Sequence, residues 1–437
     1  MNDSILKATS EFARRIKRAC RSRFDTLKVL PLVPVCRYRY DLTRRNLASK
    51  AKHCKIRVLF LVNETAKWKA QSLYDRMLAS GRWDPVIGRT IIKTDALFPK
   101  ETVRARADEL KVFFERRGMR CEDAGDFVAC SPIPLESLSP DIVFYQQPWG
   151  LYPCQFPAEV SKFALACYIP YYVEGFGNPD DECRLPFHRL LYLHFLQSET
   201  WADVFRKSVS RFASVQQFVG TGHTMLDQFR MEDTKPYAGS PVIYSPHWSF
   251  SHPKHENTLN LSTFLWTGRA VLEYAKSHPS IKWAFRPHPA LRRKLSVTGA
   301  WTQDEVDHYY AEWKSIGEVS YTGDYTDLFK RSKAMVTDCE SFLAEYPTTG
   351  KPLIRLDSPD RKLTPMPPAE KLLDSLYTAR NLGEMHDLFD SVLLRDEDPL
   401  REKRLESVRS AGLIECDAAG NILRHLENLI GISHDKS

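Results

Sequence analysis

The fold is decided by the stretch Lys333-Ala-Met-Val-Thr-Asp-Cys-Glu-Ser-Phe-Leu-Ala-Glu-Tyr-Pro-Thr-Thr-Gly-Lys-Pro352. Its apolar run 334–336 is typical of a buried strand, Thr337-Asp338 supplies a helix cap, and 340–346 predicts a short helix that ends before Pro347. The turn follows the carboxyl end of a strand, which is where ligands bind in open α/β sheets, and free N–H groups at a helix start favour an anion. A plain capped connection without a ligand fits the same residues.

Strands and helices alternate on both sides of this stretch, which predicts an α/β protein with two Rossmann-like domains. The first series starts at the apolar run 55–62 and the second at 241–244, with a polar, turn-rich segment at 233–240 between them. The expected regions are a basic helix with its linker at 1–54, an N-terminal Rossmann-like domain at 55–235, a C-terminal Rossmann-like domain at 236–380 and C-terminal helices at 381–437.

Three further segments give specific expectations. We interpret 27–55 as a linker with some helix, 162–172 as a strand, and 185–207 as one continuous helix. The outcome for each follows from the structure.

Composition favours a globular protein of the cytoplasm. The chain has 437 residues, 43% of them hydrophobic, and a formal charge of +7. Its longest apolar runs, such as 58–62, fall far short of the roughly 20 residues needed to span a bilayer, and the N-terminus lacks the apolar core of a secretory signal. The ten cysteines are scattered without zinc-type or C-x-x-C spacing, so we expect reduced thiols.

The positive charge is concentrated before residue 56. Residues 4–24 combine apolar positions at helical spacing with many Lys and Arg, a pattern that predicts a basic amphipathic helix. Such a helix can lie on an anionic membrane surface, or its apolar stripe can pack on the body of the protein. Arginines interleaved with tyrosines at 38–45 are too weak a signal for a nucleic-acid partner, so none is expected.

Polar residues that could carry chemistry follow consecutive strands of the second series. His247 comes after one strand, Arg286 and His288 after the next, and Ser341 lies in the opening stretch. If the sheet is parallel, all these turns lie along one edge. A guanidinium, two imidazoles and a hydroxyl beside a helix start suit a phosphate group.

The motifs Pro241-Val-Ile-Tyr-Ser-Pro-His-Trp248, Phe285-Arg-Pro-His-Pro289 and Val336-Thr-Asp-Cys-Glu-Ser-Phe-Leu-Ala-Glu-Tyr346 resemble those of CDP-glycerol glycerophosphotransferases. The resemblance is clear from about Val219 to Pro352. It implies a GT-B architecture, with two Rossmann-like domains whose parallel sheets face each other across a cleft, the donor on the C-terminal domain and the acceptor on the N-terminal one.

The resemblance also implies roles for individual residues. The nucleotide pyrophosphate would be held by Arg286, His288, Asp338 and Ser341. The candidate substrate-binding residues further include Ser245 and the loosely matched turn with Gly222 and His223. Glu340 replaces a small polar residue of the family, and its charge beside a phosphate is unfavourable unless it binds ribose or pairs with a cation, which leaves the donor open.

The general base departs from the family pattern. Family polymerases carry a catalytic histidine in the N-terminal domain, but the corresponding region 168–177 has none. We therefore expect Glu174 to take the acceptor proton, assisted by Tyr171 or Tyr172, with His247 and His288 as further catalytic candidates. A loop carboxylate in an ion pair is the alternative interpretation of Glu174.

No cofactor is expected. The acidic clusters 180–182 and 396–398 lack the spacing of a nucleotide-sugar metal site and fit solvated loops, so no metal is predicted. The glycine pairs at 175–177 and 220–222 are incomplete as dinucleotide fingerprints, so NAD is not predicted either.

The preferred hypothesis is a transferase that moves glycerol phosphate or a related polyol phosphate from a CDP-activated donor to a hydroxyl of a surface glycan or lipid-linked acceptor. One alternative is a GT-B glycosyltransferase of capsule or lipopolysaccharide synthesis that uses CMP-Kdo or a UDP-sugar. Another is a non-catalytic, membrane-associated scaffold. The expected location is the cytoplasm, including the inner face of its membrane, and the sequence leaves the oligomeric state open.

Overall fold

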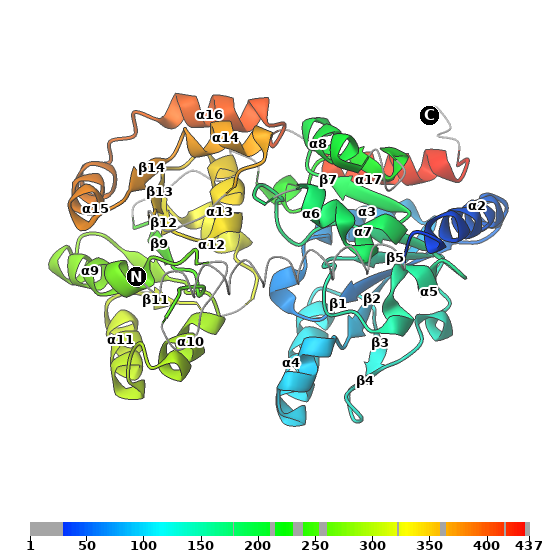
Figure 1. Cartoon of the computed structure of the whole chain (residues 1–437), viewed down its shortest axis with the longest axis horizontal. Helices are drawn as coiled ribbons and strands as arrows, with labels where there is room; N and C mark the ends of the chain where they lie inside the picture. Colours follow the sequence, from blue (N-terminus) through cyan, green and yellow to red (C-terminus); the bar gives the residue numbers. More distant parts are fainter. Residues whose placement is uncertain are drawn as a thin grey trace, which may run out of the picture. The chain divides into compact units, whose positions relative to one another are not determined.

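The computed structural model describes residues 29–177, 179–209, 215–229, 239–252, 260–320, 323–358, 364–414 and 417–432 (Figure 1). The expected basic helix at 4–24 and most of the expected linker at 233–240 lie outside these ranges. Contacts divide the chain into two compact units. We call them the N-terminal unit, which runs to Tyr171 and includes Asn178–Thr221 and the chain from Ala419, and the C-terminal unit, which contains Tyr172–Gly177 and Gly222–Ala418.

The N-terminal unit is built on a sheet with the strand order β4-β3-β2-β1-β5-β6-β7-β8. Neighbouring strands pair in parallel, except for the antiparallel pair of β3 and β4. The order reverses between β1 and β5, which makes this the topological switch point of the sheet. The strands are β1 (Ile56–Val62), β2 (Trp83–Thr90), β3 (Cys121–Asp126), β4 (Ser131–Pro132), β5 (Ile142–Tyr145), β6 (Leu165–Tyr168), β7 (Leu193–Leu196) and β8 (Phe218–Gly220).

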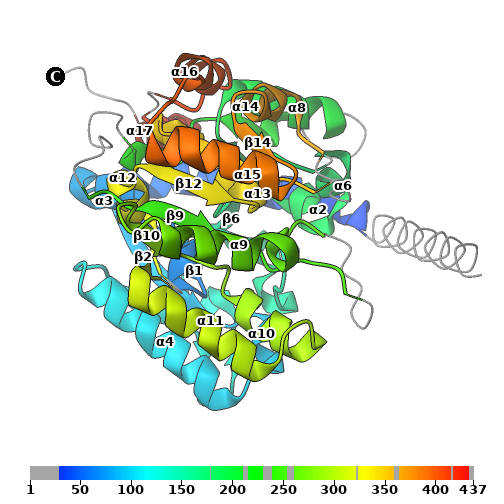
Figure 2. The ribbon, with the colours of Figure 1, turned by 90° about the vertical axis from the view of Figure 1, so that its left-hand side faces the viewer.

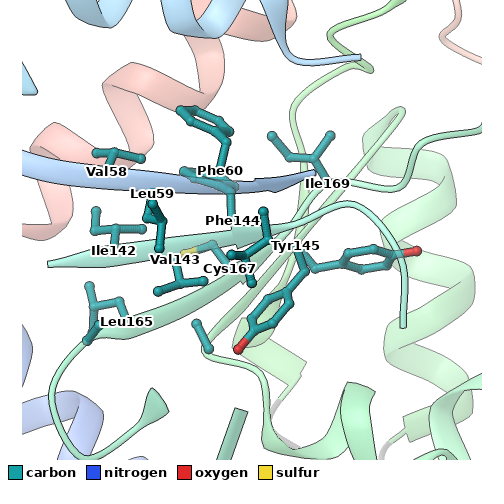
Figure 3. Close-up of a cluster of buried hydrophobic side chains, with 14 of the residues drawn as sticks. Val58, Leu59, Phe60, Ile142, Val143, Phe144, Tyr145, Leu165, Cys167 and Ile169 are labelled. Carbon is teal, nitrogen blue, oxygen red and sulfur yellow. The ribbon is translucent and has the colours of Figure 1, made fainter. Parts of the chain in front are cut away.

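The central strands are buried, which is why β5 is apolar along its whole length and β1 is apolar apart from Arg57 near its amino end. In the core, the ring of Phe60 on β1 stacks on that of Phe144 on β5 with centroids 5.0 Å apart (Figure 3). Burying one such side chain contributes about 1.5–3 kcal/mol to the free energy of unfolding. The helices are α2 (Leu32–Lys50), α3 (Gln71–Ser80), α4 (Lys100–Glu115), α5 (Pro157–Val160), α6 (Pro179–Arg184), α7 (Pro186–Leu190), α8 (Glu199–Val209) and α17 (Ala418–Leu429).

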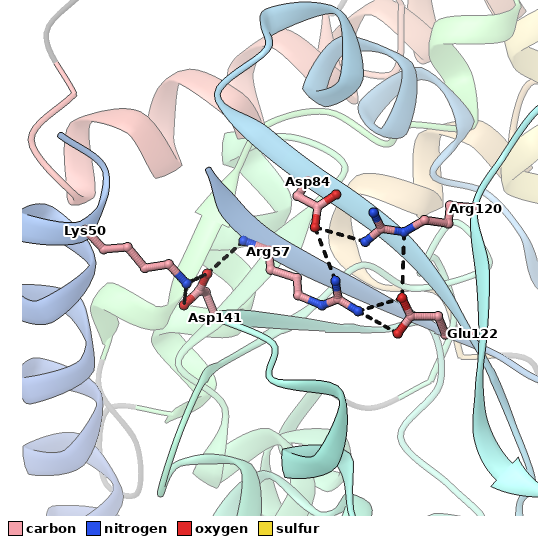
Figure 4. A network of polar contacts seen from close by, with 6 residues as sticks. All are labelled: Lys50, Arg57, Asp84, Arg120, Glu122 and Asp141. Atoms are coloured by element: carbon pink, nitrogen blue, oxygen red, sulfur yellow. Dashed lines mark hydrogen bonds and ion pairs between the residues drawn. The ribbon is translucent and has the colours of Figure 1, made fainter. Parts of the chain in front are cut away.

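Ion pairs join the amino ends of the central strands to one another and to α2. Lys50 at the end of α2 contacts the carboxylate of Asp141 before β5 at 2.6 Å (Figure 4). Arg57 on β1 reaches Asp84 on β2 at 3.3 Å and Glu122 on β3. These pairs are partly exposed, and each is worth about 0.2–1 kcal/mol. This edge of the sheet is therefore held by structural charge pairs.

The C-terminal unit has a wholly parallel sheet with the order β11-β10-β9-β12-β13-β14. This is the Rossmann order 3-2-1-4-5-6, with its switch point between β9 and β12. The strands are β9 (Val242–Ser245), β10 (Trp283–Phe285), β11 (Glu318–Val319), β12 (Ala334–Thr337), β13 (Leu353–Leu356) and β14 (Tyr377–Ala379).

One face of this second sheet shares a core with α9, α10, α11 and α15, and Figure 2 shows α9 and α15 in front of the strands. The helices of the unit are α9 (Phe264–Ser277), α10 (Ala290–Thr298), α11 (Gln303–Ile316), α12 (Thr326–Arg331), α13 (Glu340–Glu345), α14 (Pro367–Leu373), α15 (Leu382–Leu388), followed by a π-helical segment (Phe389–Leu394), and α16 (Arg401–Ser410). A capping box starts α11, because Thr302 Oγ1 accepts from the Glu305 N–H at 3.2 Å while the Glu305 carboxylate accepts from the Thr302 N–H at 2.8 Å.

The structure defines the helical part of residues 27–55 and corrects the expectation for residues 185–207. The expected linker at 27–55 contains the 19-residue helix α2, which is anchored in the N-terminal unit by Tyr40. This tyrosine is fully buried, and its hydroxyl donates to the carbonyl of Leu190 at 2.8 Å. The expected continuous helix at 185–207 is instead α7, strand β7 and α8. A four-residue buried strand cannot be told from buried helix by periodicity, and this one was missed.

Other boundaries also differ from the expected ones. The strand expected at 162–172 is limited to β6, and its continuation 172–177 joins the C-terminal unit. Of the C-terminal helices expected at 381–437, α15 and α16 pack in the C-terminal unit, while the chain from Ala419 in α17 belongs to the N-terminal unit. Among the helices that the structure describes, none has both the length and the apolarity to cross a membrane.

Candidate functional site

The switch point of the C-terminal sheet brings together two of the turns expected from the sequence. Strands β9 and β12 pair in parallel, with Ser245 opposite Thr337. The Thr337 hydroxyl donates to the carbonyl of Ser245 at 2.6 Å, which ties the carboxyl ends of the two strands together. Because the chain leaves the two strands toward opposite faces of the sheet, this edge is where an open α/β sheet forms a ligand crevice.

The side chain of Asp338 holds the loop after β9 in place through hydrogen bonds. This side chain is fully buried, and Oδ1 accepts from the backbone N–H of His247 at 2.5 Å. The other oxygen, Oδ2, accepts from the N–H of Thr263 at 2.6 Å and from its hydroxyl at 3.0 Å. The carboxylate thus fixes both His247 and the start of α9. Direct contact with a pyrophosphate, which the family resemblance implies, stays a prediction for this residue.

His247 and His288 lie next to each other at the ends of β9 and β10. Their ring centroids are 5.2 Å apart, with the ring planes at 65°. In each ring Nδ1 accepts from the backbone N–H two residues further on, from Ser249 at 3.2 Å and from Ala290 at 3.1 Å. A neutral imidazole whose Nδ1 accepts a hydrogen bond carries its proton on Nε2. A neutral ring held in this way can donate a hydrogen bond from Nε2 to an anion, and in His247 the Ser249 hydroxyl also lies 2.7 Å from Nδ1.

Arg286, between these histidines in sequence, is 8% exposed. Its guanidinium donates to Ser320 Oγ at 2.8 Å and to the carbonyl of Gly323 at 3.0 Å, and it lies 5.2 Å from the ring centre of Tyr325. Burial lowers the pKa of Arg286, but a guanidinium remains charged in proteins. The Ser245 hydroxyl donates to the carbonyl of Arg286 at 2.7 Å, so Ser245 joins the ends of β9 and β10.

Glu340 and Ser341 begin α13 and are half-buried. The Ser341 hydroxyl lies 3.5 Å from the sulfur of Cys339. Burial raises the pKa of the Cys339 thiol to about 12, so this cysteine is unreactive at neutral pH. The helix has six residues and a correspondingly small dipole, so cationic and N–H donors of neighbouring loops must supply most of the stabilisation of an anion here.

Glu174 lies in the C-terminal unit and not in the N-terminal domain that the sequence suggested. Its segment Tyr172–Gly177 is held by backbone hydrogen bonds, from Gly177 N–H to the Thr364 carbonyl at 2.8 Å and from Met366 N–H to the Gly175 carbonyl at 3.0 Å. Glu174 itself is 1% exposed. If Glu174 acts as the general base, as predicted, the base is a buried carboxylate.

Sequence reasoning missed Glu345, at the end of α13. It is fully buried; Oε2 accepts from the Tyr325 hydroxyl at 2.7 Å and Oε1 from the N–H of Val173 at 3.2 Å. Through these two hydrogen bonds Glu345 links Tyr325, whose ring lies beside the Arg286 guanidinium, to the segment that carries Glu174. The signal was a charged residue within the otherwise apolar run Phe342–Tyr346.

The remaining expected residues lie in their own loops. Gly222 has φ +95°, a conformation that favours glycine, and it precedes His223, which is 1% exposed and whose Nδ1 accepts from the Met225 N–H at 3.2 Å. In the acidic cluster at 396–398 every carboxylate has a basic partner, namely Lys333, Arg395 and Arg404 in turn. In the described ranges no three His, Cys, Asp or Glu side chains group as a metal site.

Comparisons with known proteins identify the fold. No protein-family model and no curated protein sequence matches the chain. Among solved structures, UDP-GlcNAc 2-epimerase from Neisseria meningitidis bound to UDP-GlcNAc is 14% identical, with a TM-score of 0.51 over 86% of this chain and 100% of that one. The S. aureus MnaA–UDP structure is 13% identical, with a TM-score of 0.53 over 87% and 99%. Together with the two Rossmann-like sheets, these likenesses establish the GT-B fold expected from the sequence.

The wall teichoic acid polymerase TagF has the same fold. A variant of TagF is 10% identical, with a TM-score of 0.53 over 94% of this chain and 97% of that one, and a structure with CDPG is 11% identical, with a TM-score of 0.51 over 95% and 99%. The resemblance to glycerophosphotransferases seen in the sequence is thus confirmed at the level of the fold. At these identities the likeness shows the fold alone, so donor and acceptor belong to the proposal that follows.

Proposed function

We propose that the protein is a GT-B transferase that moves glycerol phosphate, or a related polyol phosphate, from a CDP-activated donor to a hydroxyl of a cell-surface glycan acceptor. The observation that carries the proposal is the pair of imidazoles of His247 and His288, 5.2 Å apart at the carboxyl ends of β9 and β10, each with a backbone N–H directed at its Nδ1. The sequence motifs around these histidines, and the fold shared with TagF, support the choice of donor.

In the proposed reaction the acceptor hydroxyl attacks the distal phosphorus of the donor in line. A new P–O bond forms, the P–O bond to the bridging oxygen breaks, and CMP leaves with the electron pair of that bond. His247 and His288 would donate hydrogen bonds to the phosphate oxygens, and Arg286 would add positive charge. The proton acceptor in this scheme is Glu174, with a histidine as the alternative.

The scheme assigns no step to a metal ion. Positive charge and N–H donors from Arg286, His247 and His288 would supply the stabilisation that a divalent cation gives in other nucleotide enzymes. Turnover is therefore expected to persist in EDTA.

The experiment is a donor screen with the purified full chain. CDP-glycerol, CDP-ribitol, CMP-Kdo and UDP-sugars are each incubated with a mixture of surface-glycan acceptors, and released nucleotide and product mass are measured. CMP release with transfer of a polyol phosphate supports the proposal. CMP release with transfer of Kdo, or UDP release with transfer of a sugar, establishes the glycosyltransferase alternative. Tight donor binding without any turnover would favour the scaffold and contradict the proposal.

Membrane association belongs to the same proposal and rests on the basic amphipathic pattern of residues 4–24. Because α2 is anchored in the N-terminal unit, a deletion up to residue 54 would damage that unit. A matched test compares flotation of the full chain with anionic liposomes against a full-length variant in which Arg14, Arg15 and Arg18 are changed to Glu. Equal flotation of the two would remove the membrane proposal.

A further inference from the structure

The carboxyl edge of the N-terminal sheet carries a cluster that the proposed donor chemistry does not use. It consists of Glu64, Lys67, Trp149 and Tyr171, which we call the Trp149 cluster. The indole of Trp149 meets the ring of Tyr171 edge-on with centroids 5.8 Å apart, and Lys67 Nζ lies 5.8 Å from the centre of the Tyr171 ring. Lys67 Nζ also donates to the Glu64 carboxylate at 2.8 Å. The four side chains therefore form one connected group.

The sheet topology explains why these residues meet. Glu64 and Lys67 follow β1, Trp149 follows β5 and Tyr171 follows β6, and these three strands are neighbours in the order β1-β5-β6. The switch point of this sheet lies between β1 and β5, so the cluster occupies the position where open α/β sheets bind ligands.

Backbone hydrogen bonds hold the loop of Trp149 in place. The Gln147 side-chain amide donates to the Trp149 carbonyl at 2.9 Å, and Gly150 then turns the chain with φ +77°. The Gly150 carbonyl accepts from the N–H of Lys93, in the loop after β2, at 2.7 Å. On the other side, the N–H of Tyr171 donates to the Gln146 carbonyl at 3.0 Å. The aromatic pair is thus presented on a fixed scaffold.

The cluster includes a partly exposed indole. Trp149 is 44% exposed, and it is the only tryptophan among the exposed large hydrophobic side chains that the structure describes. Tyr171 beside it is half-buried. An indole left in water at the ligand edge of a sheet is typical of a binding surface, because tryptophan otherwise buries most of its area.

The chemistry of the cluster selects a class of ligand. Aromatic faces pack against the C–H faces of sugars and polyols, and a carboxylate beside an ammonium can accept and donate hydrogen bonds to neighbouring hydroxyls. The charge of Lys67 is matched by that of Glu64, so the cluster has no excess of positive charge that would select a phosphate. We propose that the Trp149 cluster is a binding site for a neutral, hydroxyl-rich sugar or polyol unit; its assignment as the acceptor subsite rests on the proposed function.

Direct binding tests the site without relying on turnover. Saturation-transfer difference NMR and titration of the full chain use chitotetraose as the neutral probe and a synthetic tetramer of glycerol phosphate as the charged one. We expect saturation transfer from the wild type to the carbon-bound protons of chitotetraose, with Trp149→Ala and Tyr171→Ala each weakening this binding roughly tenfold. Tyr38→Ala is the matched control, because Tyr38 on α2 is 66% exposed outside the cluster.

The outcomes separate this inference from the proposed function. Failure of the wild type to bind chitotetraose, including binding of the charged tetramer alone, would overturn the site, as would binding by Trp149→Ala and Tyr171→Ala within about twofold of the wild type. If Trp149→Ala abolishes probe binding while the donor screen shows no transfer, the carbohydrate site stands and the transferase assignment fails. If transfer occurs, Trp149→Ala should raise the acceptor KM roughly tenfold and change kcat by less than about twofold.

Discussion

The backbone N–H of His247 donates a 2.5 Å hydrogen bond to the carboxylate of Asp338, a residue 91 positions further along the chain. The same carboxylate accepts two hydrogen bonds from Thr263 at the start of α9. One buried side chain thus fixes a strand-end histidine and a helix start together. The position of His247 depends on Asp338 whether or not Asp338 ever touches a ligand.

Replacing Asp338 by Asn should therefore destabilise the C-terminal unit. An amide NH₂ group would face a backbone N–H and leave that donor unsatisfied in the interior, which costs about 1–3 kcal/mol of unfolding free energy. Urea denaturation measures the loss. Asp304→Asn, at an exposed position on α11, is the matched control and should change stability by less than about 0.5 kcal/mol. Equal effects of the two substitutions would contradict the anchoring role.

Glu345 and Tyr325 should behave as a coupled pair. Their buried hydrogen bond of 2.7 Å loses its charged acceptor in Glu345→Gln and is removed altogether in Tyr325→Phe. Each single change is expected to lower the unfolding free energy by about 1–3 kcal/mol, with the double variant losing less than the sum by about 0.5 kcal/mol or more. Denaturation of all four proteins gives the coupling energy. Strict additivity would show that the two side chains act independently.

Buried histidines should make the N-terminal unit sensitive to acid. Burial lowers the pKa of His188 to about 3, and burial with the neighbouring His188 charge lowers the pKa of His194 well below its ordinary value. Their ring centroids are 5.3 Å apart. Below pH of about 6.5 the unfolded chain binds protons that the folded chain does not, so stability present at neutral pH is lost as the pH falls toward 3.

The variant His188→Phe should reduce this dependence. The unfolding free energy of the wild type, obtained from urea denaturation, is expected to fall from pH 7 to pH 5 by up to about 1.4 kcal/mol per pH unit for each buried histidine. The fall should be smaller in His188→Phe. His308→Phe, at an exposed position on α11, should follow the wild type. An unchanged pH profile in His188→Phe would contradict the assignment of a buried neutral imidazole.

Lys351 should make the free energy of unfolding depend on pH above neutrality. Burial lowers its pKa to about 7, while its ammonium lies 2.7 Å from the Phe329 carbonyl at the end of α12. Between pH of about 7 and 10.4 the unfolded chain holds a proton that the folded chain has released, so this group makes stability rise with pH. Lys351→Met should remove that contribution, measured as a smaller gain in urea midpoint from pH 7 to pH 9. Lys314→Met, exposed on α11, should keep the wild-type slope.

Patterns in the sequence predicted most of the architecture because the decisive signals were local. Apolar runs and turns located the strands that end at Ser245, Phe285 and Thr337, and the parallel topology then brought their turns to one edge. The strand β7 was missed because four buried residues carry no distinctive period. The segment 27–55 is predicted as a linker with some helix, but its prolines and basic residues do not indicate that α2 spans 19 residues and is anchored by Tyr40.

The candidate site was harder to predict because burial and partners are tertiary properties. Nothing in the spacing of residues 168–177 indicates that the segment with Glu174 leaves its own sheet and pairs with Thr364 and Met366. Asp338 and Glu345 accept hydrogen bonds from donors far away in the sequence, so local patterns do not show their structural roles. The two tautomer-fixing contacts of His247 and His288 are local, two residues apart, but a sequence does not show ring orientation.

In the proposed reaction the strand-end histidines of the C-terminal unit hold the reacting phosphate of a nucleotide donor. The most direct test is the rate of CMP release from CDP-glycerol by wild type and by His288→Ala, with His308→Ala as a control for an exposed histidine in the same unit. Loss of one preorganised donor should lower kcat about 10²–10³-fold in His288→Ala and leave His308→Ala unchanged. A rate in His288→Ala within about twofold of an active wild type would contradict the claim.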